Sequence, residues 1–160
     1  MNDIAISCPL NNLSFGNISY NILREIYSRG LSVCLFPVSN QVDLSSFDRT
    51  LKDFAEWVQL SIHNRYKKLG NDTPFLNIWH IQGAEATISK NSVLYTFHET
   101  SKATQSEINI CNLYKKVLFS SAYSNQVFKD SGLMNSDYAN PGFDKDFFEN
   151  DSFKLKNKIH

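Results

Sequence analysis

The stretch IAISCPLNNLSFGNISYNILREIYSRGLSVCLFPV, residues 4–38, decides the fold. Residues 4–8 alternate apolar with small side chains, which predicts a strand. After a polar turn, apolar side chains recur at helical spacing over residues 18–27, and Gly30 follows as a helix-ending residue. Residues 31–38 are a second buried strand. The stretch therefore predicts two parallel strands joined by a helix.

Strands and helices continue to alternate along the rest of the chain. Apolar positions at three- and four-residue steps predict one helix of about six turns over residues 47–69. The remaining expected elements are strands at 75–81, 93–97, 117–120 and 138–141, with helices at 101–113 and 123–131. This pattern predicts an α/β fold, a three-layer Rossmann-like sandwich on a mostly parallel sheet, with the strand order left open. We expect one domain over residues 1–150 and a charged, linker-like segment over 151–160.

The composition of the chain narrows the classes of function and partner that we expect. The 160 residues carry 16 basic and 16 acidic side chains without a basic block, so a nucleic-acid partner is not expected. No apolar run approaches the length of a membrane span, and the first residues lack the features of a signal peptide. Cys8, Cys34 and Cys111 have no metal-type spacing and sit among apolar residues, so we interpret them as reduced core thiols of a cytosolic protein.

The segment Val93–Thr100, with the sequence VLYTFHET, is the first candidate for a functional site. A short buried strand is followed at once by two titratable residues, His98 and Glu99. Ligands of parallel α/β sheets bind at the carboxyl ends of the strands, so this pair is placed for binding or catalysis. The alternative, that the pair only starts a loop and caps the next helix, stays open.

Two small residues are candidates for ligand contacts. Gly16 is expected in the loop before the first helix, where a backbone can approach a phosphate, although an ordinary turn glycine is the alternative. One glycine does not make a dinucleotide fingerprint, and no P-loop is present, so no nicotinamide or flavin cofactor is expected. Ser121 follows a buried strand, where it is either a helix N-cap or a hydroxyl that faces a ligand.

The remaining polar residues suggest no metal site. His63, His80 and His160 share no ligand spacing with carboxylates, and no serine lies in a Gly-x-Ser-x-Gly elbow. His80, beside Trp79, is expected to line the same edge of the sheet as His98. Asp144 lies in a turn and is either a loop residue or a hinge contact.

Several motifs in order resemble the amino-terminal domain of retaining glycosyltransferases with two Rossmann-like domains (the GT-B architecture, family-four type). The resemblance covers nearly the whole chain. Its motifs are Arg29-Gly30-Leu31-Ser32-Val33, Leu94-Tyr95-Thr96-Phe97-His98-Glu99-Thr100, Lys116-Val117-Leu118-Phe119-Ser120-Ser121, Asn125-Gln126-Val127-Phe128, Ser131-Gly132-Leu133, and Asn140-Pro141-Gly142-Phe143-Asp144 with Phe147-Phe148.

The resemblance implies transfer of a sugar from a nucleotide-sugar donor to a hydroxyl of a saccharide or glycan-lipid acceptor, with retention and without a metal or other cofactor. It implies catalytic roles for His98, at the transferred sugar, and for Glu99, which would orient hydroxyls or stabilise developing positive charge. The donor- or acceptor-binding residues that it implies are Gly16, Asn17, Thr100, Ser121 and Asp144.

The chain departs from this family in two respects. The carboxyl-terminal domain with the nucleotide-sugar site and the Glu-x7-Glu motif is missing, and we expect residues 156–160 to be the start of its first strand. Phe15 stands where the family has a paired glycine before Gly16. We therefore expect the missing domain as a partner, and a 160-residue chain that is inactive alone and self-associates through an apolar strip on the cleft side.

The expected location is cytoplasmic, including a peripheral position at the inner face of a membrane. The alternative function is a catalytically inactive Rossmann-like module that binds a nucleotide or sugar and works with a partner.

Overall fold

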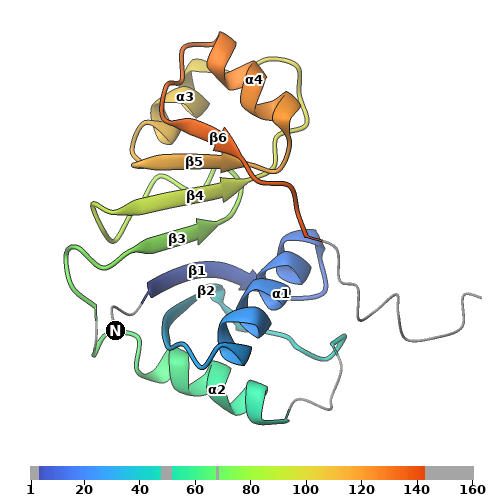
Figure 1. Ribbon diagram of the computed structural model, residues 1–160, viewed down its shortest axis with the longest axis vertical. Helices are drawn as coiled ribbons and strands as arrows, with labels where there is room; N and C mark the ends of the chain where they lie inside the picture. The colour runs from blue at the N-terminus through green and yellow to red at the C-terminus, as the bar shows by residue number, and fades with distance from the viewer. Residues whose placement is uncertain (1–3, 48–51, 68, 143–160) are drawn as a thin grey trace, which may run out of the picture.

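The computed structural model describes residues 4–47, 52–67 and 69–142 (Figure 1). Six strands form one sheet in the order β2-β1-β3-β4-β5-β6, and every neighbouring pair is parallel. The elements are β1 (Ile4–Leu10), α1 (Ser14–Ser28), β2 (Val33–Val42), α2 (Lys52–His63), β3 (Phe75–Ile78), β4 (Ser92–Thr96), α3 (Gln105–Cys111), β5 (Lys116–Phe119), α4 (Ala122–Asp130) and β6 (Ser136–Tyr138). The predicted Rossmann-like α/β fold on a parallel sheet is confirmed.

The helices cover opposite faces at the two ends of the sheet. Helix α1 packs through Leu23 against Ile6 and its neighbours in β1 and β2. Helices α3 and α4 pack on β4 and β5 through a separate apolar cluster that contains Leu94, Val117 and Phe128. The register pairs Ile6 with Leu76, and Leu94 with the next residue of β3, so these two clusters lie on opposite faces of the sheet.

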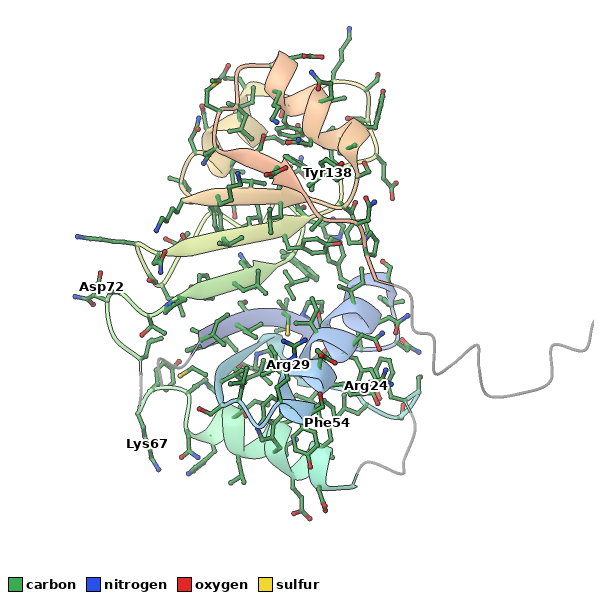
Figure 2. The ribbon with its side chains drawn as sticks, in the orientation of Figure 1. Arg24, Arg29, Phe54, Lys67, Asp72 and Tyr138 are labelled. Carbon is green, nitrogen blue, oxygen red and sulfur yellow. The ribbon has the colours of Figure 1, made fainter. Side chains whose placement is uncertain are left out.

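Helix α2 lies along the β2 edge and is shorter than the predicted helix of six turns (Figure 1). Phe54 reaches from α2 toward α1, where its ring centroid lies 5.5 Å from that of Tyr27 (Figure 2). Phe47, expected to begin this helix, is not helical and instead stacks on Tyr20 at 3.9 Å. Residues 64–67 form turns after the helix, and the side chain of Arg65 donates to the carbonyl of Ile62 at its last turn.

Gly16 lies inside α1 and not in the loop before it, which corrects the prediction. A β-carbon at this position would overlap the backbone carbonyl and the side-chain amide oxygen of Asn11. Asn11 itself shapes the turn, because its amide oxygen accepts a hydrogen bond from the backbone N–H of Leu13 at 3.0 Å. The glycine therefore allows the first turn of α1 to pack directly against the chain leaving β1.

Two more boundaries differ from the prediction near the carboxyl edge. Strand β3 ends at Ile78, so Trp79 and His80 lie beyond it. Helix α3 begins at Gln105 and not at residue 101, because Thr104 caps it in a reciprocal capping box with Glu107. The last strand is also earlier than predicted, at residues 136–138.

The three cysteines are free and buried, as predicted. Burial raises the pKa of the Cys8 thiol to about 12, and burial with the nearby Glu107 carboxylate raises the pKa of Cys111 to about 12. Both thiols therefore stay protonated at neutral pH and pack as small apolar side chains.

A groove of about 770 Å³ runs along α1 over the face of the sheet that α3 and α4 leave uncovered. Leu76, Tyr95 and Leu118 form its floor, and Ile22 is in the α1 wall. The segment after β6 closes the far side, where the Tyr95 hydroxyl donates to the carbonyl of Ala139 at 3.1 Å. This hollow with an apolar floor therefore lies beside α1 on one face of the sheet.

The contact at Gly16 predicts the effect of adding one methyl group. Gly16→Ala should lower the free energy of unfolding by about 1–3 kcal/mol, because α1 must move away from Asn11. Gly70→Ala is the matched control, since its β-carbon would meet only the Thr73 hydroxyl at 3.6 Å, and it should change stability by less than about 0.5 kcal/mol. Urea denaturation followed by circular dichroism measures both values, and equal stability of the two variants would contradict this interpretation.

Candidate functional site at the carboxyl edge

The strand order creates a switch point between β1 and β3. From β1 the chain crosses to β2 at one side, and it later returns to add β3 on the other side of β1. Ligands of parallel α/β sheets bind outside the carboxyl ends of the strands at such a point. The segments found here are residues 11–13 after β1, Trp79-His80 after β3 and residues 97–104 after β4.

Aromatic side chains fill this switch point. The ring of Phe15, at the start of α1, is only 6% exposed. Its centroid lies 5.8 Å from Trp79, 4.6 Å from His80 and 4.8 Å from Phe97. Trp79 and Phe97 are half-buried and His80 is exposed. We call these four residues the aromatic cluster. The contact between Phe15 and Phe97 brings the start of α1 and the segment after β4 together at one edge of the sheet.

The side chain of His98 is buried and is not exposed at the carboxyl edge of the sheet. Its side chain is 5% exposed and its ring packs edge-on against Phe128 of α4, with centroids 4.7 Å apart. Its Nε2 lies 3.0 Å from the Thr100 hydroxyl and 3.6 Å from a Glu107 carboxylate oxygen. Its Nδ1 is buried and has no hydrogen-bond partner among the described residues. The ring thus fastens the segment after β4 to α3 and α4.

The hydrogen bonds around Thr100 fix the proton on this ring. The Thr100 hydroxyl donates its one hydrogen to the carbonyl of Lys102 at 2.9 Å. In its contact with His98 the Thr100 hydroxyl oxygen is therefore the acceptor. The His98 Nε2 atom is the donor and carries a hydrogen. The lone pair or proton of Nδ1 then faces the protein interior. In this arrangement the imidazole can position its neighbours but does not offer a base to the edge.

Ser121 is the N-cap of α4, one of its two predicted roles. Its hydroxyl accepts from the backbone N–H of Ser124 at 3.1 Å and lies 2.8 Å from the Ser124 hydroxyl. The Ser124 hydroxyl in turn donates to the carbonyl of His98 at 2.7 Å. Because the Ser124 hydrogen is used there, Ser121 donates its own hydrogen to Ser124. The first turn of α4 therefore holds the backbone of the segment after β4.

Glu99 is the predicted catalytic residue that the structure exposes. Its neighbours on both sides are tied down by the contacts of His98 and Thr100, so the carboxylate projects from a fixed backbone. Asn17 is also exposed, on the first turns of α1, where its oxygens accept from the Asn21 amide at 3.0 and 3.2 Å. Asp144 lies outside the described residues.

The sequence predicted part of this arrangement. It placed His80, Trp79 and the His98–Glu99 pair at one edge, but it did not identify Phe15 or Phe97 as site residues. The cap at Thr104 was readable from the Thr-x-x-Glu signature at 104–107. The contact of Phe15 with Phe97 had no local signal, because the two residues are 82 positions apart and meet only through the sheet.

The described residues contain no group of three or more His, Cys, Asp or Glu side chains that could hold a metal ion. Within the same ranges, no helix has both the length and the apolar character needed to cross a membrane. Comparison with known proteins gives no match: no protein family, no curated protein and no solved structure is significantly similar to the chain.

The two residues of the predicted catalytic pair should respond differently to truncation. His98→Ala removes a buried ring and its contacts with Thr100 and Phe128, so it should cost about 2 kcal/mol or more of stability. Glu99→Ala removes an exposed side chain and should stay within about 0.5 kcal/mol of the parent chain. Thermal unfolding of both variants tests this, and an unchanged melting temperature for His98→Ala would disprove the anchoring role.

Proposed function

We propose that the chain is the amino-terminal, acceptor-side domain of a retaining glycosyltransferase with two Rossmann-like domains. The enzyme transfers a sugar from a nucleotide-sugar donor to an acceptor hydroxyl. The proposal rests on the family resemblance of the motifs together with one structural observation. Glu99, in the best-defined of those motifs, is exposed at the carboxyl edge on a segment held by α3 and α4.

The chemistry of sugar transfer suits a carboxylate at this position. As the bond to the leaving diphosphate breaks, the transferred sugar ring gains positive charge, and a fixed carboxylate nearby lowers the barrier. A flexible side chain would lose part of this benefit, because it must reorganise as charge develops. The hydrogen bonds from Ser124 to the His98 carbonyl and from Thr100 to Lys102 supply the necessary rigidity at Glu99.

The burial of His98 and the exposure of Glu99 support a different division of roles between the two residues. In this proposal Glu99 meets the sugar, and His98 is a positioning residue that acts through the backbone it anchors. Gly16 serves the packing of α1, and its buried position supports no separate contact with the donor diphosphate. In this proposal the donor is held mainly by the second domain of the architecture.

The Glu99 carboxylate should be needed for turnover and not for folding. In the full-length protein, Glu99→Gln should reduce kcat about a hundredfold, equivalent to roughly 3 kcal/mol of barrier, with an unchanged melting temperature. Glu56→Gln is the matched control, since Glu56 is equally exposed but lies on α2 at the β2 edge. Transfer is measured with labelled nucleotide sugars, and the anomeric configuration of the product by NMR.

Two outcomes would contradict the proposal. Turnover near the parent value in Glu99→Gln would make Glu99 an ordinary loop residue. Saturable sugar or nucleotide binding by the full-length protein, without transfer to any acceptor, would favour the alternative of an inactive binding module.

The chain by itself should also self-associate, and we propose the groove beside α1 as the contact surface. Leu76 and Leu118, in the apolar floor of this groove, are partly exposed. Light scattering should show a mass that rises with concentration, and Ile22→Asp should suppress the rise while the melting temperature confirms folding. Leu60→Asp, at an exposed position of α2, should leave the rise unchanged. A strict monomer at high concentration would disprove this expectation.

A further inference from the structure

The aromatic cluster is partly exposed at the point where an α/β sheet binds its ligands. Phe15 forms a buried base, on which Trp79 and Phe97 are half-buried and His80 is exposed. If the rings of Trp79 and Phe97 served packing alone, deeper burial would be favoured, because exposing apolar ring surface to water is unfavourable. The cluster therefore offers an apolar surface to a ligand at the carboxyl edge.

The segment after β3 holds Trp79 in a fixed position. Ile81 and Ala84 are buried in the apolar cluster under α3 and α4, and the Tyr114 hydroxyl donates to the Ala84 carbonyl at 2.8 Å. Gly83 has φ +98°, and a β-carbon there would lie 3.0 Å from the indole nitrogen of Trp79. The loop thus packs against the nitrogen-bearing edge of the indole, and a ring held by such a contact loses less conformational entropy when a ligand binds.

The polar groups around the cluster fit hydroxyl groups better than phosphates. The Glu99 carboxylate, an acceptor for hydroxyl groups, lies two residues after Phe97. Residues 11–17 and 79–84 contain no lysine or arginine, and Lys102 is the one lysine or arginine of residues 97–104. A nucleotide diphosphate requires compensation of its negative charge, and a single lysine supplies little of it.

We infer that Trp79, Phe97 and His80 form a stacking site for one pyranose ring of a neutral saccharide. The aliphatic C–H groups on one face of a pyranose carry slight positive charge and pack on the negative face of an aromatic ring. The exposed Glu99 carboxylate then accepts hydrogen bonds from hydroxyl groups at the rim of the sugar. This inference rests on the proposed function, in which the ring belongs to the acceptor and its reacting hydroxyl points toward Glu99.

Binding to the 160-residue chain tests the inference directly. Saturation-transfer NMR with methyl α-D-glucopyranoside, methyl β-D-galactopyranoside and maltose should detect millimolar binding of at least one probe, and Trp79→Ala should weaken it about tenfold or more. Tyr66→Ala, which removes an exposed ring of the turn after α2, should leave binding unchanged. Since Trp57 and Trp79 are the two tryptophans, fluorescence of a Trp57→Phe variant reports whether the sugar reaches Trp79.

Three results would overturn the inference. Saccharide binding that is undiminished by Trp79→Ala would place the sugar elsewhere. Binding of uridine diphosphate in place of the saccharides, lost in Trp79→Ala, would make the cluster a nucleotide-base site. If none of the probes binds the chain, an acceptor KM unchanged by Trp79→Ala in the full-length protein would exclude the stacking site.

The same data separate this inference from the proposed function. A chain that binds sugars through Trp79 in a protein that never transfers sugar would support the stacking site and refute the enzyme. Transfer that depends on Glu99 but not on Trp79 would support the enzyme and refute the stacking site.

Discussion

The close approach of α1 to the end of β1 is the contact on which the carboxyl edge depends. It is possible only because Gly16 has no β-carbon to collide with Asn11. The same approach places Phe15 in the switch point, where three other aromatic rings pack on it. A bulkier residue at position 16 would displace the helix, and with it the base of the aromatic cluster. One glycine thus controls the packing of the candidate site.

The direction of the crossovers explains why one face of the sheet carries a groove. Connections between parallel strands are right-handed, so steps in opposite directions along the sheet place their helices on opposite faces. The step from β1 to β2 runs one way and places α1 on its face, whereas the steps from β4 to β6 run the other way and place α3 and α4 opposite. Leu76 and Leu118 therefore remain partly open beside α1.

The segment after β4 shows how neighbouring residues can take different roles. The His98 side chain is buried beneath α3 and α4, where it contacts Phe128 and Glu107. The next side chain, that of Glu99, is exposed to solvent. A titratable residue at the end of a buried strand can either face the candidate site or hold the backbone next to it. Its role depends on whether the neighbouring helices cover its side chain. In this protein the histidine side chain is buried against the helices, and the carboxylate side chain is exposed.

The sequence by itself determined the parallel α/β fold, the place of the candidate site and the buried state of the cysteines. Each follows from local patterns: strands with apolar runs, helices with a repeat near 3.6 residues, and polar residues at strand ends. The boundary of α3 was also readable, from Thr104 and Glu107. Only the tertiary structure decided the strand order, the packing of Phe15 with Phe97 and the burial of His98. These depend on contacts between segments distant in the chain, for which periodicity within one element carries no information.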